Sequence, residues 1–294
     1  NPEAIPYRTT YYKKDWGFCM SYKKFKKLKD KEYLVNIDTT SKKGFLNYGE
    51  IYIKGKSSKE ILLSTNICHP SLANNELSGP TVLAFIADYL SKRKNNLSYR
   101  IVFLPETIGS LTFIKKKLLS LRNKVLCGFN CVCIGDERSY SILLSKYNTG
   151  ISDYFGIKAI KKTTKKFKKY TWLHRGSDER QYSSPGMDIE FTSLMRSKYG
   201  VYKKYHTSND QLGKVVTKKG LYGGYKLLIN LINLIENEKF PKAVFIGEPH
   251  LSKRNLYPSI GGDIHPQFFR DLLNFLSYCD GNNPVGKISE LCKI

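Results

Sequence analysis

The stretch Ser64-Thr-Asn-Ile-Cys-His69-Pro-Ser-Leu-Ala-Asn-Asn75-Glu76-Leu-Ser-Gly79-Pro80 decides the fold of this chain. A strand-like apolar run from residue 60 to 67 ends at a histidine, and a short polar loop then leads into a helix-like run. The imidazole therefore lies at the carboxyl end of a predicted strand, where open α/β sheets place their ligand sites. Histidine is also the commonest metal ligand among side chains. We expect a binding site to begin at His69.

Outward from this stretch, strands and helices alternate from about residue 58. We predict strands at 61–67, 99–104, 125–134 and 188–195, and helices at 77–93, 110–121 and 218–237. The βαβαβ order with short links predicts an α/β fold, a mostly parallel sheet flanked by helices.

The two ends of the chain have a different pattern. Before residue 58, short β-like segments at 35–38, 45–46 and 50–54 are separated by turn residues, which predicts a small antiparallel sheet. After residue 243, an amphipathic helix at 266–278, a turn and a helix start at 285–291 resemble the opening of a helix-turn-helix or winged helix.

Composition favours a folded globular protein, with 41% apolar and 13% aromatic residues in 294. We find no apolar run of membrane-spanning length and no secretory leader. The first residue is Asn1 rather than methionine, which predicts a partial or processed chain. The seven cysteines lack the spacing of a zinc knuckle or a disulfide framework, so we expect reduced thiols and a cytoplasmic protein.

The net charge of +24 is carried mostly by lysine, which supplies 39 of the 49 basic residues. Two dense runs, 23–29 and 161–169, are either solvated faces or contacts for a polyanion. A charged polysaccharide or a nucleotide-linked precursor fits such a polyanion as well as DNA does, because nucleic-acid surfaces usually favour arginine.

Two carboxylates recur at positions equivalent to His69. Glu106 follows the second predicted strand and Asp136 follows the third. Neighbouring parallel strands lie about 4.8 Å apart, so groups at their carboxyl ends can converge on one or two metal ions. Imidazole and carboxylate ligands with an additional base suit zinc-assisted attack of water on an acyl carbon.

Two later motifs are candidates for the same site. His206, within Tyr-His-Thr-Ser, is a further candidate metal ligand, and Asp178-Glu179-Arg180 could position a substrate. Each candidate also has a structural explanation: a loop histidine, a carboxylate favoured at a helix N-terminus, or a surface ion-pair cluster.

In their order along the chain, these motifs resemble an uncharacterised bacterial family of aminopeptidase-like proteins in the zinc-dependent exopeptidase superfamily. The resemblance rests on the strand-ending histidine, Asn-Asn-Glu-Leu-Ser-Gly, Pro-Glu106-Thr-Ile-Gly-Ser, Asp178-Glu-Arg-Gln-Tyr-Ser-Ser-Pro-Gly and Tyr205-His206-Thr-Ser, and covers nearly the whole chain. It implies residues 1–57 as a lead-in with a small embedded β domain, 58–243 as the peptidase-like core and 244–294 as a partial winged helix. Because the family normally has a longer N-terminus, part of its peptidase sheet is expected to precede this chain.

The resemblance also implies roles. It implies Zn²⁺ held at His69 and His206, with Asp136 or Glu76 as a further ligand, and Glu106 as the general base. Asp178, Glu179 and Arg180 would hold a peptide or amide-containing small substrate or order the ligands. It implies amide or peptide hydrolysis, linked through kinship to surface polysaccharide biosynthesis.

Two departures leave the activity open. Asn75 occupies the place of an aspartate that bridges two metals in related enzymes, and we expect the adjacent Glu76 to point elsewhere. Thr107 replaces the second residue of a Glu-Glu pair. The alternatives are therefore a mononuclear hydrolase, a substrate-binding pseudo-peptidase that lacks activity, and a nucleic-acid-associated regulator.

Overall fold

The computed structural model describes residues 1–9, 13, 15–254, 256 and 266–294, and we restrict the structural account to them. The chain divides into two compact units, residues 1–231 and 232–294. The three-part division at residues 57 and 243 stays a prediction.

The first unit contains a seven-stranded sheet in the order β1-β3-β2-β4-β7-β5-β6. The central strands β3, β2, β4 and β7 are parallel, whereas β1 is antiparallel to β3 and β5 is antiparallel to β7. This confirms the predicted mostly parallel α/β sheet. The strands are β1 Gly49–Ile53, β2 Glu60–Asn66, β3 Ser98–Leu104, β4 Val125–Cys131, β5 Ser141–Leu143, β6 Lys168–Tyr170 and β7 Phe191–Met195.

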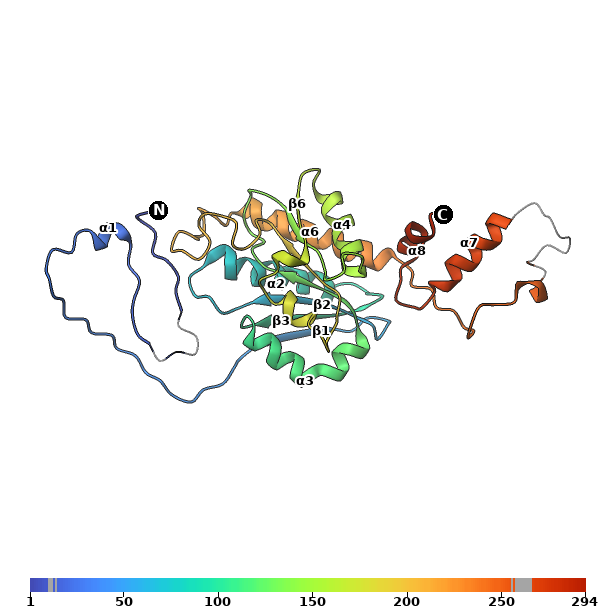
Figure 1. Ribbon diagram of the computed structural model, residues 1–294, viewed down its shortest axis with the longest axis horizontal. Coiled ribbons are helices and arrows are strands. Elements are labelled where there is room, and N and C mark those ends of the chain that lie inside the picture. The colour runs from blue at the N-terminus through green and yellow to red at the C-terminus, as the bar shows by residue number, and fades with distance from the viewer. Residues whose placement is uncertain (10–12, 14, 255, 257–265) are drawn as a thin grey trace. The chain divides into compact units, whose positions relative to one another are not determined.

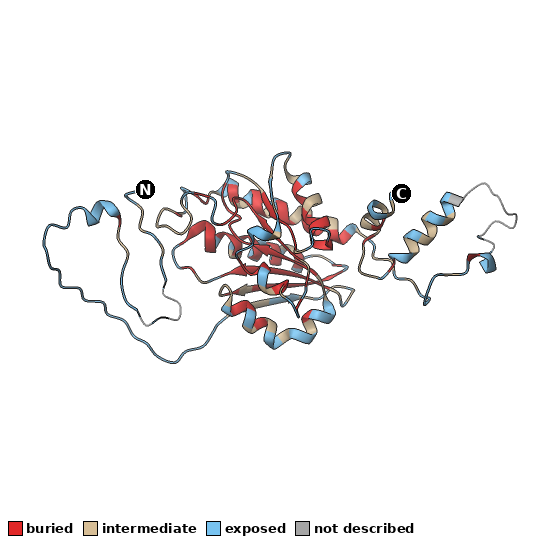
Figure 2. Cartoon of the chain, in the orientation of Figure 1, coloured by how far each residue is buried: buried red, intermediate tan, exposed pale blue. Residues whose placement is uncertain are grey.

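Helices cover both faces of this sheet (Figure 1). The longer ones are α2 Ser78–Ser91, α3 Ile108–Lys124, α4 Ile151–Thr163 and α6 Lys218–Asn237, and α5 Glu179–Tyr182 is a single turn. Helix α3 lies on one face, and α2 and α4 lie on the other with the first part of α6 (Figure 1). Buried residues concentrate in the central strands and in the inward faces of these helices (Figure 2).

The central strand β2 is buried along its whole length, as expected for a parallel strand covered on both faces. On one face, Leu62 joins an apolar cluster with Phe113 of α3 and Phe191 of β7. Helix α6 lies against the loop that follows β4, since a Cβ at Gly224 would stand 2.4 Å from the Ile134 carbonyl oxygen. This packing fixes the positions of the carboxyl ends of the central strands relative to the helices.

The N-terminal region differs from the predicted small sheet. Of the three predicted strands, only the last is present, as β1, and it extends the main sheet. Residues 35–38 and 45–46 have no regular secondary structure because their side chains are exposed and have no apolar face to pack against. Helix α1, Tyr22–Phe25, is one turn. Residues 5–8 instead lie along 206–208, where Tyr7 N donates to His206 O at 2.9 Å and Ser208 N donates to Ile5 O at 2.8 Å.

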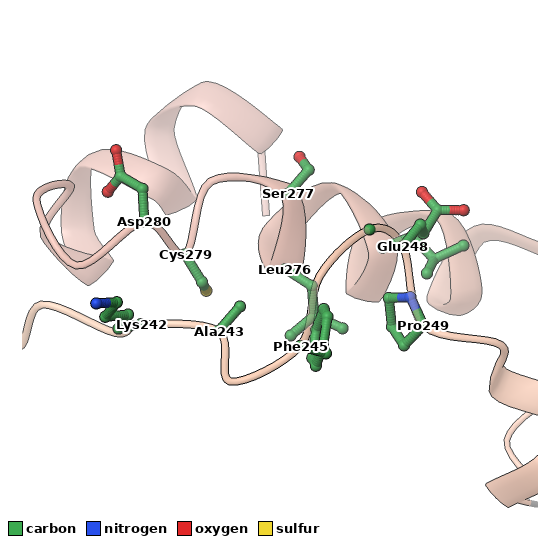
Figure 3. A pocket seen from close by; sticks show the side chains of 11 residues that line it. Lys242, Ala243, Phe245, Glu248, Pro249, Leu276, Ser277, Cys279 and Asp280 are labelled. Atoms are coloured by element: carbon green, nitrogen blue, oxygen red, sulfur yellow. The ribbon is translucent and has the colours of Figure 1, made fainter.

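The second unit contains the two predicted helices, α7 Pro266–Ser277 and α8 Val285–Cys292, and a short 3-10 turn, Leu251–Arg254. Residues 241–243 pair with the turn after α7, through Ala243 N to Cys279 O at 2.7 Å and Gly281 N to Pro241 O at 2.9 Å. Between this segment and α7 lies a cavity of about 430 Å³ (Figure 3). Across the described part of the chain, we find no helix that combines the length and apolarity needed to cross a membrane.

Candidate metal centre

A π-helical turn, Ala73–Leu77, shapes the loop after β2. The Asp210 carboxylate accepts the backbone N–H groups of Asn74 at 2.9 Å and Asn75 at 3.0 Å and so fixes the start of this turn. The wider turn directs the carboxylate of Glu76 to His69, with Glu76 Oε1 2.8 Å from His69 Nδ1. The expectation that Glu76 points elsewhere is therefore wrong, because the residues after Leu72 do not form an ordinary α-helical start.

His69 is the centre of a cluster of potential ligand atoms. Its Nδ1 lies 2.8 Å from Glu76 Oε1 and 3.1 Å from Cys68 Sγ, and all three atoms lie within 4.8 Å of one another. His69 and Glu76 are only 6% and 3% exposed. Although burial lowers the pKa of His69, the hydrogen bond and charge of Glu76 outweigh it and raise that pKa above its usual value. The same surroundings raise the pKa of the Cys68 thiol, mainly through burial and then through the charge of Glu76.

His206, the second histidine predicted as a metal ligand, lies beside this cluster. The ring centroids of His69 and His206 are 4.9 Å apart, and the Tyr7 ring lies 4.9 Å from His69 and 5.3 Å from His206. Burial and the neighbouring His69 lower the pKa of His206 to about 4, so its ring is neutral. Its Nε2 is buried without a hydrogen-bond partner among the described residues, so this nitrogen is available to bind a metal ion.

Glu106 approaches the cluster from the end of β3. Its backbone N–H donates to Cys68 Sγ at 3.2 Å, and Asn66 Nδ2 donates to Glu106 Oε1 at 3.2 Å. Burial raises the pKa of this carboxyl group. Thr107 has a φ of 65°, a strained conformation for a β-branched residue that turns the chain sharply into α3. Glu106 is therefore a basic group held at the edge of the cluster.

The three predicted substrate residues divide into two kinds. Asp178 and Glu179 are completely buried. Glu179 accepts five hydrogen bonds, from Gly176 N, Ser177 N, Tyr199 OH, Asn130 Nδ2 and Ser193 Oγ. Asp178 accepts from Thr107 N at 2.7 Å and Ser110 Oγ at 2.8 Å, and so fixes the turn beside Glu106. Arg180 is exposed and donates to Thr107 Oγ1 at 2.9 Å.

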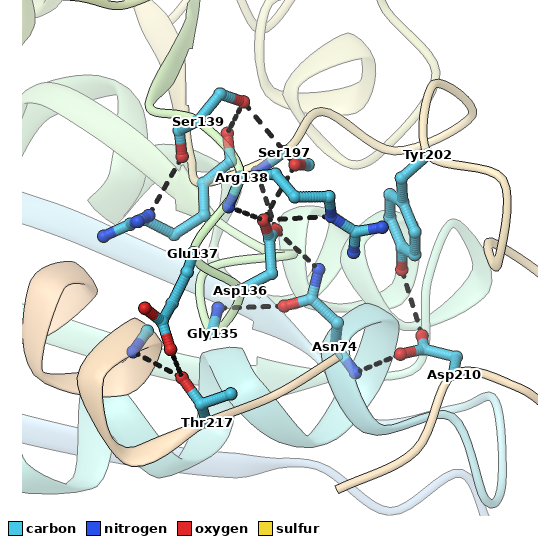
Figure 4. A network of polar contacts seen from close by, with 12 residues as sticks. Asn74, Gly135, Asp136, Glu137, Arg138, Ser139, Ser197, Tyr202, Asp210 and Thr217 are labelled. Carbon is cyan, nitrogen blue, oxygen red and sulfur yellow. Dashed lines mark hydrogen bonds and ion pairs between the residues drawn. The ribbon is translucent and has the colours of Figure 1, made fainter. Parts of the chain in front are cut away.

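Asp136 lies in a separate network (Figure 4). Its two oxygens accept from Asn74 Nδ2 at 3.1 Å, from Arg138 N at 2.8 Å and from both Ser197 N and Ser197 Oγ at 2.8 Å. These bonds tie the loop after β4 to the residues that follow β7 and to the π-helical turn. Asp136 is therefore not brought into the His69 cluster in this conformation.

The residues fit one metal ion better than a bridged pair. Cys68, His69 and Glu76 offer three converging donor atoms, and the nearby His206 offers a nitrogen that no described residue hydrogen-bonds. Asn75, by contrast, uses its amide as a donor to Glu76 Oε1 at 2.6 Å, and a neutral amide is a weak bridge between two dications. The fit is to a single ion with mixed nitrogen, oxygen and sulfur ligands.

Sequence reasoning missed Cys68 and undervalued Glu76. The signal for Cys68 was its position next to a strand-ending histidine, which places both side chains at one sheet edge. Glu76 could not be placed, because the π-helical turn that directs it depends on the distant Asp210.

A mostly parallel sheet flanked by helices, with histidine and acidic side chains gathered where β2 and β3 end, defines an aminopeptidase-like α/β protein. The chain belongs to the family described as a domain of unknown function, DUF4910, which matches residues 6–238. Residues 239–294 match a winged helix-turn-helix family, which confirms the predicted C-terminal winged helix. The family was thus foreseen from the motifs.

A protein of Clostridium acetobutylicum is 41% identical over 291 residues, and the match covers 97% of this chain. It carries the provisional name of a polysaccharide biosynthesis protein with an aminopeptidase-like domain. The chain spans 65% of the length of that relative.

Solved structures give the same fold. A crystal structure from Clostridium acetobutylicum, described provisionally as a peptidase, is 37% identical, with a TM-score of 0.80 over 100% of this chain and 66% of that one. The zinc aminopeptidase of Bacillus subtilis is 15% identical, with a TM-score of 0.53 over 64% of this chain and 49% of that one. At that identity, the second likeness concerns the fold alone.

Proposed function

We propose that this chain holds the metal centre of a single-zinc amide or peptide hydrolase of the aminopeptidase type. The observation that carries the proposal is the contact between His69 and Glu76, with the His206 ring beside His69 and the half-buried carboxylate of Glu106 at the edge. The His206 Nε2 atom has no hydrogen-bond partner among the described residues. His69 and Glu76 would hold the ion, with His206 completing the set. Zinc bound there would supply Lewis acidity for activating water and polarising a carbonyl group.

Glu106 would be the general base in this proposal. Its raised pKa brings its proton affinity closer to neutral pH, where acid–base catalysis is most effective. Asn66 orients one of its oxygens, and the N–H donated to Cys68 holds its backbone. Glu106 would take a proton from the attacking water and return it to the leaving amine.

The substrate residues fit two tasks. Arg180 is exposed beside Thr107 and could pair with a carboxylate of a peptide or amide-containing substrate. Asp178 and Glu179 are buried, so they would order the turns that carry Arg180 and Glu106. The name of the Clostridium relative leads us to propose an amide group on a polysaccharide precursor as the substrate class, with the chain acting in the cytoplasm.

The test is Glu106→Gln in the full chain, assayed with aminoacyl amides and N-acylated amino sugars. We expect hydrolysis to fall by about 10²- to 10⁴-fold, the usual contribution of a general base, while metal content stays the same. The matched control is Glu137→Gln, a carboxylate after β4 that pairs instead with Thr217 and Lys219. Full activity in Glu106→Gln would overturn the assignment of the base.

A second candidate is a binding protein that recognises the amide without hydrolysing it. The neutral Asn75 and the fully bonded Asp136 favour this alternative, because both occur where related enzymes are expected to use charged ligands. Saturable binding of the same amides by metal-loaded protein, without turnover, would select this candidate over the hydrolase.

A further inference from the structure

Cys68 is a half-buried thiol at the centre of the site that the proposed reaction does not use. We propose that Cys68 is a metal ligand through Sγ, so that one thiophilic divalent cation is held by Cys68 Sγ, His69 Nδ1 and Glu76 Oε1. This inference rests on the proposed function and specifies which atoms hold its metal.

Two of the three donor residues, Cys68 and Glu76, are already oriented by neighbouring groups. The Glu106 N–H points to Cys68 Sγ at 3.2 Å, and Asn75 Nδ2 donates to Glu76 Oε1 at 2.6 Å. The backbone N–H of Cys68 donates to the other Glu76 oxygen at 2.7 Å. Hydrogen bonds from outside the coordination set are what normally orient metal ligands and tune their basicity.

The charge balance also favours a cation here. Glu76 is buried and Glu106 is half-buried, and Glu76 Oε1 lies 2.8 Å from His69 Nδ1. A divalent cation would compensate these carboxylates and a thiolate together. On binding, bonds from the metal to Cys68 Sγ and His69 Nδ1 would form, and the thiol proton and the proton that His69 Nδ1 shares with Glu76 would pass to solvent.

The donor set also limits the kind of metal. Sulfur and imidazole nitrogen select zinc-like transition metals over Mg²⁺ or Ca²⁺, which require oxygen ligands. The site would be mononuclear, because Asn75 donates to Glu76 and the Asp136 oxygens are bonded to Asn74, Arg138 and Ser197. A thiolate would make the bound ion less electrophilic than one with only nitrogen and oxygen ligands.

The experiment titrates Co²⁺ into the chelator-treated full chain and records the absorption spectrum and the heat of binding. Cobalt bound to a thiolate gives an intense sulfur-to-metal charge-transfer band in the near ultraviolet. We expect this band at one equivalent per chain, its loss in Cys68→Ser, and its retention in the control Cys292→Ser, a half-exposed cysteine of α8. An unchanged melting temperature of metal-free Cys68→Ser would exclude misfolding.

The other outcomes separate this inference from the proposed function. Binding without the band, abolished by His69→Ala, would overturn sulfur ligation but leave the metal site of the proposed hydrolase intact. A band that persists in Cys68→Ser would assign the sulfur to another cysteine and overturn the inference. Absence of cobalt binding would contradict both proposals.

Discussion

At the scale of single residues, the titration of Asp178 should make the stability of the fold depend on pH. Burial raises its pKa to about 7 from the usual 3.8, despite the hydrogen bonds from Thr107 and Ser110. Its other oxygen, Oδ2, is buried without a partner among the described residues, as suits a protonated acid. Between about pH 4 and 7 the folded chain would therefore keep a proton that the unfolded chain has lost.

This difference fixes the sign of a pH effect. The free energy of unfolding should fall as pH rises through that window, because there the folded state binds more protons than the unfolded state. Asp178→Asn keeps an acceptor for Thr107 and Ser110 and removes the titration. We expect the melting temperature of the variant to rise relative to that of wild type between pH 5 and pH 8. The difference in free energy of unfolding between the two proteins should change by at most about 1.4 kcal/mol per pH unit.

Thermal melts of both proteins at each pH measure the effect. The exposed Asp88, which pairs with Lys92, provides the control Asp88→Asn, for which the offset from wild type should stay nearly constant. An equally constant offset for Asp178→Asn would show that Asp178 is already ionised at pH 5.

Local sequence determines the positions of some residues of the site but not of others. His69, Glu106 and His206 could be recognised because each follows a pattern that local sequence determines: a strand end or a short motif. The direction of Glu76 and the bonding of Asp136 could not, since both depend on partners more than 60 positions away, Asp210 and Ser197. Hydrophobic periodicity carries no information about such polar partners.

At the scale of elements, the same distinction holds. The predicted strands and helices around His69 closely match β2, α2, β3, α3 and β4, and the predicted helix 218–237 is α6. The segment 141–170 was missed: β5 and β6 have three residues each, and α4 and β6 include much of a lysine run that we assigned to solvated surface or polyanion contact. Short edge strands are defined by pairing with neighbours, which one sequence does not display.

Helix α2 depends on the absence of a side chain at Gly79. A Cβ there would stand 2.1 Å from Thr65 Oγ1 and 2.4 Å from the Cys131 carbonyl oxygen, which are hydrogen-bonded to each other. Gly79→Ala should therefore destabilise the protein by about 1–3 kcal/mol through overpacking, although alanine is the better helix former. The same change would displace the π-helical turn that carries Glu76.

Urea unfolding measures this effect, and cobalt affinity reports on the turn. Thr81→Ala, in the same helix but exposed, is the matched control and should change stability by no more than about 0.5 kcal/mol. A Gly79→Ala variant as stable as wild type would mean that α2 can move away from β2 and β4 at little cost.

At the scale of the whole molecule, the basic charge is not where a DNA-binding explanation needs it. The winged-helix segment 239–294 has seven basic and five acidic residues, a net charge of +2 of the +24. The lysine runs at 23–29 and 161–169 both lie in the unit formed by residues 1–231. Because nucleic-acid readers concentrate basic residues on the reading domain, this distribution disfavours the regulator alternative.

The division into two units leads to the last prediction. Every group that we assign to the metal centre lies between residues 66 and 210, within the first unit, and the DUF4910 match ends at residue 238. A chain ending after Glu238 keeps all of α6. We therefore expect it to bind one Co²⁺ with the spectrum and affinity of the full chain, as measured by the same titration.

His69→Ala in the shortened chain is the control and should abolish binding. If the shortened chain stays folded by circular dichroism but loses the metal, the winged-helix unit must support the centre, and the site could not be explained by the aminopeptidase-like fold alone.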